Sequence, residues 1–493
     1  MERNRSGGPT GRVTAAQPAT VGLEISQWKY LSSEAREPQM HAILTVRADG
    51  TEGGGGPGPL LAQVLVVDCS GSMAWPPEKL HAARQAAVAA LRMLPDGTPF
   101  AVVRGAESAA MVHPATETMA RADAEQRAAA ENALHRLVTG GGTCIGTWLD
   151  LSLRLLAEQA APIGHVLLLT DGKNQHDDLM PLSDVLEECA GRFVCDAWGI
   201  GDGWDGRELI RITSRLHGSA ASVREESALP GEYENLISRL LTKAVPELGI
   251  SVTPMSGATV RYLKQVFPTE AELPFDETGR EDDGTRRFVT RAWGDETRRY
   301  QLCLSADPTG LPRREDLQLA VVALDVSGGD GVRLPQPRPC VVHWTDDPGL
   351  SRQTDVQVEH FQQHQMLGEA VAAATDAHRR GERDLAEHHL GRAVQLAHAI
   401  GASGQLDRMA RLVEIVDATA GRVRIRSGVA AIDFEHLITA SSHSTYGPAS
   451  APGSGALPAG AAGATVRCPA CEQKAPVTAR FCPTCGHRIG ERP

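Results

Sequence analysis

The stretch Val64-Leu-Val-Val-Asp68-Cys-Ser70-Gly-Ser72-Met73 constrains the fold of this chain more than any other. Its continuous apolar run, with glycine-rich sequence before it, is typical of a buried parallel strand. Open α/β sheets present their functional groups at the carboxyl ends of such strands. The stretch therefore predicts an α/β sheet with Asp68, Ser70 and Ser72 at its edge.

The pattern Asp68-x-Ser70-x-Ser72 has two interpretations. One carboxylate and two hydroxyls provide hard oxygen donors, which suit Mg²⁺ or Mn²⁺. Alternatively, Asp68 and Ser70 cap the following helix by accepting hydrogen bonds from its first amides. The spacing by itself favours neither interpretation.

Length and charge exclude several classes of protein. The chain has 493 residues, enough for several domains of roughly 100–200 residues each. Its net charge of −12 argues against general binding to nucleic acid or anionic membranes. No apolar run approaches the ~20 residues of a membrane span, and residues 1–20 are polar, are expected to be disordered and lack a secretory signal. We therefore expect a cytoplasmic protein without a membrane segment.

Residues 60–245 alternate between apolar runs and helical patterns. Besides the first run, strands are expected at 100–103, 166–170 and 192–198, and helices at 78–94, 121–137, 145–160, 182–190, 207–216 and 233–243. This alternation predicts a doubly wound, Rossmann-like parallel sheet with helices on both faces.

Two more oxygen donors fall at the same predicted sheet edge. Thr143 ends the glycine-rich segment Thr139-Gly-Gly-Gly-Thr143, where the backbone can approach a ligand closely. Asp171 directly follows the apolar run Val166-Leu-Leu-Leu-Thr170. With Asp68, Ser70 and Ser72 they make two carboxylates and three hydroxyls, which together with water can complete an octahedral Mg²⁺ shell. The combination favours the metal interpretation.

The residues Asp68-x-Ser70-x-Ser72, Thr143 and Thr170-Asp171-Gly172 resemble the metal-ion-dependent adhesion site (MIDAS) of von Willebrand factor A domains. The resemblance implies that Ser70, Ser72 and Thr143 are direct ligands of the ion, with Asp68 and Asp171 close to it, often through water. It also implies that an acidic residue of a protein partner completes the coordination.

Three enzyme motifs fail in this region. The segment Gly199-Ile-Gly-Asp-Gly203 has Trp204 where a dinucleotide-binding loop needs its third glycine, and the 139–143 loop lacks the Gly-Lys-Ser/Thr ending of a P-loop. Ser70 has Asp68 two residues before it, whereas a nucleophile elbow has glycine there. We therefore expect a protein that is not an enzyme.

Some reactive side chains near these motifs have simpler explanations. His165 and His176 flank the strand before Asp171 and are expected to be structural. Cys69 and Cys144 are neighbours of the expected ligands, and buried thiols are favoured over a disulfide.

Residues 21–52 and 246–346 both have β patterns. Strands are expected at 21–25, 42–46, 260–266, 287–293, 299–305, 317–326 and 340–344. Because neither group has other partners nearby, we expect them to form one split β-sandwich into which residues 60–245 are inserted.

Residues 355–438 have helical patterns at 356–380, 382–400 and 404–419. The sequence after Gly381 resembles half of a tetratricopeptide hairpin, which is too little for a solenoid, so we expect a small packed helical segment. Residues 440–465 have the composition of a flexible linker. The hydroxyl residues at its start are candidates for phosphorylation, but a solvated loop is favoured; they are Ser441, Ser442, Ser444 and Thr445.

The tail, residues 466–490, has two Cys-x-x-Cys pairs. They are Cys468, Cys471, Cys482 and Cys485. Four thiolates at this spacing suit tetrahedral Zn²⁺, whose binding would fold a segment too short for an apolar core. Redox dithiols are the alternative. The tail resembles a zinc ribbon.

Together these features predict a bacterial, cytoplasmic, metal-dependent adaptor or scaffold in signalling or complex assembly. Its partner would be a protein that offers an acidic residue to the MIDAS ion. The alternative is a subunit of a chelatase-like or remodelling complex driven by an AAA+ ATPase, whose motor would be a separate protein, because this sequence has no ATPase motif.

Overall fold

The computed structural model describes residues 19–50, 60–255, 257–275, 284–313, 315–327 and 332–444, and the backbone of 465–467 and 474–476. The chain divides into two units, Met1–Thr445 and Tyr446–Pro493. None of the helices in the described ranges combines the length and hydropathy of a membrane span.

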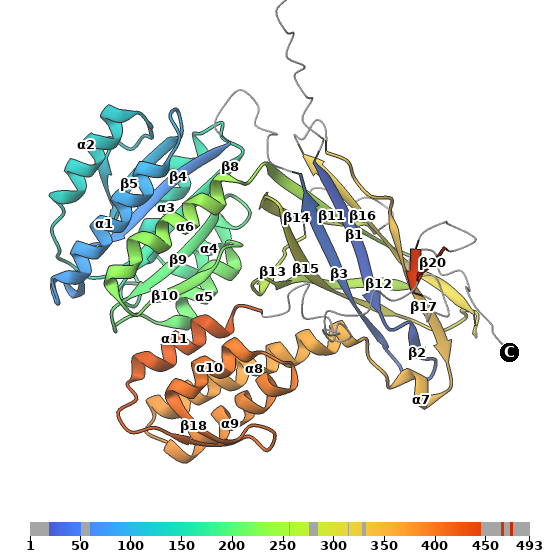
Figure 1. The fold of residues 1–493 in the computed structure, drawn as a ribbon. Helices are drawn as coiled ribbons and strands as arrows, with labels where there is room; N and C mark the ends of the chain where they lie inside the picture. The colour runs from blue at the N-terminus through green and yellow to red at the C-terminus, as the bar shows by residue number, and fades with distance from the viewer. Residues whose placement is uncertain are drawn as a thin grey trace, which may run out of the picture. The chain divides into compact units, whose positions relative to one another are not determined.

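A seven-stranded sheet forms the centre of the α/β domain (Figure 1). Its order is β10-β9-β8-β4-β5-β6, and β7 also pairs with β5. The strands are β4 (Leu61–Asp68), β5 (Pro99–Gly105), β6 (Ala110–His113), β7 (Ala120–Arg121), β8 (Ile163–Thr170), β9 (Val194–Ile200) and β10 (Ala220–Val223). Strands β4, β5, β8, β9 and β10 run parallel, whereas β6 and β7 are antiparallel to β5. Every residue of β4 is buried, as a central strand covered on both faces requires.

Helices cover both faces of this sheet. One hydrophobic core contains residues of α1, α2 and α6, and another contains residues of α3, α4 and α5. The helices are α1 (Glu78–Met93), α2 (Ala124–His135), α3 (Ile145–Ala157), α4 (Leu182–Cys189), α5 (Gly206–Arg215) and α6 (Leu229–Leu241), with short 3₁₀ turns η1 (Gly71–Ala74) and η2 (Glu226–Ala228). The predicted doubly wound, Rossmann-like arrangement is confirmed. The short antiparallel strands β6 and β7 and the edge strand β10 were not predicted.

Two five-stranded sheets make up the β-sandwich. Their orders are β1-β3-β15-β12-β13 and β14-β11-β16-β17-β2. The strands are β1 (Thr20–Gln27), β2 (Tyr30–Ser32), β3 (Gln39–Asp49), β11 (Val245–Pro254), β12 (Ala258–Phe267), β13 (Ala271–Glu272), β14 (Arg286–Trp293), β15 (Glu296–Ala306), β16 (Asp316–Ser327) and β17 (Arg338–Thr345). Buried side chains from both sheets form one core.

The sandwich joins strands from both sides of the α/β domain. Strand β3 pairs antiparallel with β15 over ten residue pairs, from Glu296 opposite Ala48 to Ser305 opposite Gln39. Strand β2 pairs parallel with β17. The α/β domain therefore lies in the sequence between two parts of one sandwich, as the unpartnered strands had indicated.

A helical segment follows the sandwich. It contains α7 (Pro348–Ser351), α8 (Val356–Arg379), α9 (Arg383–Ala399), α10 (Ser403–Leu412) and α11 (Ala431–Ser441) around one apolar core, with the hairpin β18 (Val413–Asp417) and β19 (Arg422–Ile425). The expected helix over 404–419 is wrong after Leu412. Val413 and Ile415 begin an alternating, β-branched stretch that pairs with β19 instead.

The expected linker boundary at residue 440 is also wrong. Helix α11 continues to Ser441, which is buried and whose hydroxyl donates to the Ile438 carbonyl. The Ser442 hydroxyl donates to Thr439 in the same way. Ser441 is thus part of a packed helix rather than a solvated loop, while Thr445 lies outside the described residues.

In the second unit, only the backbone of two short strands is described. Strand β20 (Thr465–Arg467) pairs antiparallel with β21 (Lys474–Pro476), from Thr465 opposite Pro476 to Arg467 opposite Lys474.

Candidate metal centre

Parallel pairing brings the predicted ligands to one edge of the α/β sheet. Strands β4 and β8 are neighbours, with Val67 opposite Leu169. Asp68 ends β4, and Asp171 immediately follows the last residue of β8. The turn η1, which contains Ser72, comes shortly after the end of β4. Both carboxylates and both serines therefore lie at the carboxyl edge of the sheet.

The Asp68 carboxylate is fully buried and is held by two donors. Its Oδ1 accepts from the Ser70 amide at 2.7 Å, and its Oδ2 accepts from Thr170 Oγ1 at 2.7 Å. Burial raises the pKa of Asp68, although these hydrogen bonds partly oppose the shift. In the described part of the chain, Asp68 has no ion-pair partner within 4.0 Å. A buried carboxylate without a counter-charge is costly, and a bound cation would offset that cost.

A chain of side-chain oxygens connects the serines to Asp171. Ser70 Oγ and Ser72 Oγ are 3.0 Å apart, and Ser72 Oγ donates to Asp171 Oδ1 at 2.6 Å. Ser70 and Asp171 are buried, whereas Ser72 is exposed. The cluster therefore opens to solvent on the Ser72 side.

Thr143 reaches the same cluster from the glycine-rich loop. A Cβ atom on Gly172 would lie 3.2 Å from Thr143 Oγ1 and 3.5 Å from Ser72 Oγ, so both hydroxyls lie close to Gly172. The loop is tied to the end of β4, because the Gly71 amide donates to the Gly141 carbonyl at 2.9 Å. Gly141 has φ +83°, a conformation that favours glycine. The structure thus brings all five predicted residues together.

Lys79 is a sixth member that the sequence analysis missed. Its ammonium group donates to Asp171 Oδ2 at 2.9 Å and lies 3.7 Å from Asp202 Oδ1. The side chain is only 6% exposed. In α1, Lys79 shares a face with the buried Ala83 and Ala86, and that position was the available signal.

The Lys79 side chain crosses the backbone of the loop after β9. A Cβ atom on Gly201, which has φ +71°, would lie 2.5 Å from Lys79 Cε. The glycine therefore provides the space through which the ammonium group reaches Asp171. Any cation that binds Asp171 must share this carboxylate with Lys79 or displace its ammonium group.

The donor set suits a hard divalent cation. Three hydroxyls and two carboxylates supply oxygen donors, and Asp68, Asp171 and Lys79 sum to one net negative charge. Across the described ranges there is no group of three or more His, Cys, Asp or Glu side chains placed to hold a metal. The hydroxyls are therefore essential to this set, which fits Mg²⁺ or Mn²⁺ better than a soft metal.

The two histidines of this region have separate roles. His165 is fully buried inside β8, where its Nε2 lies 2.9 Å from Asp196 Oδ2 and its Nδ1 lies 3.0 Å from Gln63 Oε1. His176 packs on the glycine-rich loop, since a Cβ atom on Gly142 would lie 2.2 Å from its Nε2. His165 is thus part of a core hydrogen-bond network.

The cysteines near the cluster are free thiols. Cys69 and Cys144 are buried and form no disulfide. Burial, followed by the charge of Asp68, raises the pKa of Cys69 to about 12. This thiol therefore stays protonated at neutral pH.

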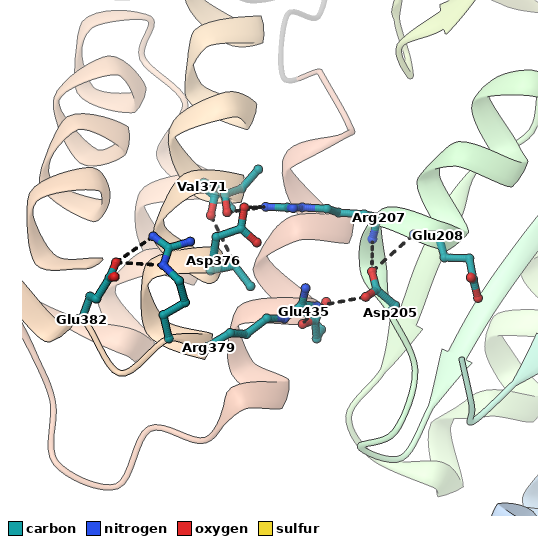
Figure 2. Close-up of polar contacts among 11 residues, drawn as sticks. Asp205, Arg207, Glu208, Val371, Asp376, Arg379, Glu382 and Glu435 are labelled. Carbon is teal, nitrogen blue, oxygen red and sulfur yellow. Dashed lines mark hydrogen bonds and ion pairs between the residues drawn. The ribbon is translucent and has the colours of Figure 1, made fainter. Parts of the chain in front are cut away.

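The loop that carries Asp202 also contacts the helical segment (Figure 2). Asp205 caps α5 by accepting from the Arg207 amide at 3.0 Å, and it accepts from Arg379 at 3.1 Å. Glu435 of α11 accepts from Arg379 and, at 3.0 Å, from the Gly206 amide. The loop therefore joins the Lys79 site to α8 and α11.

The predicted zinc ligands Cys468, Cys471, Cys482 and Cys485 lie outside the described residues. In the sequence, the first pair comes between β20 and β21, whose backbones form an antiparallel ladder.

Comparisons place the α/β domain among known folds. The family profile described as the von Willebrand factor type A domain matches residues 62–221. A solved structure described as von Willebrand factor type A from Catenulispora acidiphila is 30% identical, with a TM-score of 0.76, and the match covers 88% of this chain and 99% of that one. The crystal structure of the ArnB paralog VWA2 from Sulfolobus acidocaldarius is 12% identical, with a TM-score of 0.52 over 86% of this chain and 98% of the other, a likeness of fold alone.

A curated sequence relative matches less of the chain. The uncharacterised protein sll0103 of Synechocystis sp. is 28% identical over 224 residues, which are 44% of this chain and 50% of that protein. This chain thus spans about half the length of that relative.

Proposed function

Because the chain belongs to the von Willebrand factor type A family, we propose that its α/β domain binds a divalent cation and uses it to capture a carboxylate of a protein partner. The observation that carries the proposal is the convergence of five oxygen-bearing side chains around a buried aspartate without a cation partner. Mg²⁺ is the favoured ion and Mn²⁺ the alternative, because both prefer oxygen ligands and retain exchangeable waters.

The roles proposed for the residues are those that the resemblance to the metal-ion-dependent adhesion site implies. Ser70, Ser72 and Thr143 would be direct ligands, while Asp68 and Asp171 would balance the charge of the ion, often through water. When bound, the ion supplies an open coordination position for an anionic ligand. Ser72, on the exposed side of the cluster, marks the direction from which a partner carboxylate would approach.

Several observations support binding without catalysis. Domains of this family mediate protein–protein interaction. The histidine on β8 is committed to Asp196 and Gln63, and the thiol of Cys69 is buried beside the site. We therefore propose that this protein is a cytoplasmic bacterial adaptor or scaffold, not an enzyme, that acts in signalling or complex assembly.

The C-terminal cysteines add a second binding module to the proposal. The spacing of Cys468, Cys471, Cys482 and Cys485 supports a zinc ribbon, in which Zn²⁺ would supply the folding energy. Metal analysis of the reduced full chain should give one zinc per chain, and replacement of Cys468 and Cys471 by Ser should remove it. Zinc-free wild-type protein would contradict the ribbon.

Partner capture tests the main proposal. The tagged full chain is used to purify partners from bacterial lysate with Mg²⁺ or with EDTA, in the wild type, Asp68→Ala and Thr143→Val. Asp178→Asn is the control, because Asp178 is an exposed carboxylate in the loop after the site. We expect the same protein to be captured by the wild type and by the control only with Mg²⁺, and to be lost from both site variants.

Two results would count against this mechanism. Capture that persists in EDTA would show that no cation bridges the partner. Capture by a correctly folded Asp68→Ala variant at wild-type level would show that the partner binds elsewhere.

A further inference from the structure

A cavity of about 240 Å³ lies where β10 meets the helical segment. Helix α11 contacts both β10 and α10 at this place (Figure 1). Three arginines line the cavity, Arg224 from the chain after β10 and Arg408 and Arg411 from α10. None of these residues belongs to the candidate metal centre.

The lining of this cavity carries a positive charge. Asp433 is its single carboxylate, and it pairs with Arg224 at 2.7 Å. Arg408 and Arg411 form no ion pair within 4.0 Å and no side-chain hydrogen bond with any described residue, and Asp407, four residues before Arg411 on the same helix, does not pair with it. The cavity thus carries two uncompensated positive charges in a chain whose net charge is −12.

Hydroxyl groups add polar donors to the lining. Ser222 Oγ lies 2.7 Å from His436 Nδ1 and 3.1 Å from Thr439 Oγ1. Burial, and then the charge of Arg224, lowers the pKa of His436 to about 4, so its imidazole is neutral at pH 7. The polar lining therefore consists of two free guanidinium groups, one guanidinium group paired with the Asp433 carboxylate, and neutral hydroxyl and imidazole groups.

We propose that this cavity binds a phosphoryl dianion, with Arg408 and Arg411 as its main ligands. Two guanidinium groups match the charge of a phosphoryl group, and each can bind two of its oxygens through parallel N–H donors. The cavity volume suits a small ligand head group rather than a large cofactor. The dianion belongs either to a free phosphorylated small molecule or to a phosphorylated side chain of a peptide.

The position of the cavity predicts a structural consequence. Ser222 and Arg224 belong to the α/β domain, whereas Arg408 and Arg411 belong to the helical segment. A dianion bound by both sets would link the two parts and relieve the repulsion between the arginines. Binding should therefore raise the unfolding temperature of the protein.

The test uses inorganic phosphate as the first probe and the full chain as the protein. Thermal unfolding is followed during phosphate titration and during chloride titration at equal ionic strength, for the wild type and for Arg408→Gln/Arg411→Gln. The control variant is Arg352→Gln/Arg392→Gln, which removes two exposed arginines outside the cavity. A phosphoserine peptide and its unphosphorylated form are then compared with phosphate.

We expect a saturable rise in unfolding temperature with phosphate but not with chloride, in the wild type and in the control. The cavity variant should bind at least about tenfold more weakly for each arginine replaced. A phosphoserine peptide that binds tighter than phosphate would identify a phosphorylated side chain as the ligand, and equal or weaker binding would identify a small molecule. An equal response to chloride, or an unchanged response in the cavity variant, would overturn the proposal.

Discussion

Replacement of Lys79 by methionine should lower the stability of the metal-free protein and raise its affinity for Mg²⁺. Lys79 and Asp171 form a pair whose side chains are 6% and 0% exposed. Removing one partner of such a buried pair leaves an uncompensated charge and typically costs about 3–5 kcal/mol. We therefore expect metal-free Lys79→Met to be less stable than the metal-free wild type by roughly that amount.

Bound Mg²⁺ should recover much of this loss. At an effective dielectric constant of ~20, two unit charges 4 Å apart interact by about 4 kcal/mol. Repulsion from the ammonium group should therefore weaken the binding free energy of a nearby cation by an amount of similar order. The Lys79 ammonium group also lies 3.7 Å from Asp202 Oδ1, whose negative charge reduces that penalty in the wild type. We therefore expect the variant to bind Mg²⁺ about 10–100-fold tighter, which adds about 1.4–2.8 kcal/mol to its stabilisation by the ion.

The assay is urea unfolding with and without saturating Mg²⁺ for wild type, Lys79→Met and Lys173→Met. Lys173 is a suitable control because it is 53% exposed and lies 4.0 Å from Asp205. The control should match the wild type in both conditions. If Mg²⁺ raises the free energy of unfolding of Lys79→Met by no more than it raises that of the wild type, competition between the ammonium group and the ion is refuted. If the variant fails to fold, Lys79→Gln provides the same comparison.

Three further predictions concern stability. Gly105→Ala should lower the free energy of unfolding by about 1–3 kcal/mol in a denaturant titration, because its Cβ would lie 2.6 Å from the Trp148 ring. Burial lowers the pKa of His217 to about 4, so the unfolded chain, with an ordinary pKa near 6.5, takes up this proton first as the pH falls. This group alone should thus lower stability by up to about 1.4 kcal/mol per pH unit between about pH 6.5 and 4, and His217→Asn should reduce the measured slope by that share. Arg379→Met should destabilise the contact of α11 with the α/β domain by about 2 kcal/mol, measured by hydrogen exchange in α11, because Glu435 is 7% exposed and would lose its counter-charge (Figure 2).

Each of these three has a result that contradicts it. Unchanged unfolding of Gly105→Ala would mean that the ring can move away at little cost. A pH slope in His217→Asn as steep as that of the wild type would show that His217 does not contribute to it. Unchanged exchange in α11 of Arg379→Met would show that apolar packing alone holds the helix.

The sequence was most informative where an apolar run ended in a polar residue. Buried parallel strands are recognisable without tertiary information, and their carboxyl ends coincide at one sheet edge. Asp68 and Asp171 were therefore placed correctly from local sequence, and the glycine-rich loop pointed to Thr143. The pairing of the N-terminal strands with β15 was also inferable, because neither group had another partner.

Features that depend on contacts between distant segments were missed. Lys79 shares the buried face of an alanine-rich helix, but its pairing with Asp171 becomes apparent only when the end of β8 is placed beside that helix. The helical pattern before the hairpin has no local sequence signal that places its end at Leu412. The turn of the hairpin packs against α9, where Gly391 contacts Gly421. Strand β11 contains Pro246 and Gly249, which obscure its alternation.

Direct measurement of Mn²⁺ binding tests the central claim that the oxygen cluster at the ends of β4 and β8 holds a divalent cation. The full chain is titrated with Mn²⁺ after its zinc content has been measured, and electron paramagnetic resonance gives the concentration of free Mn²⁺. The proteins compared are the wild type, Thr143→Val and Asp178→Asn. We predict one Mn²⁺ per chain, displaceable by Mg²⁺, in the wild type and in Asp178→Asn, and none in a folded Thr143→Val. Equal Mn²⁺ binding by Thr143→Val and the wild type, or no binding by the wild type, would contradict the account.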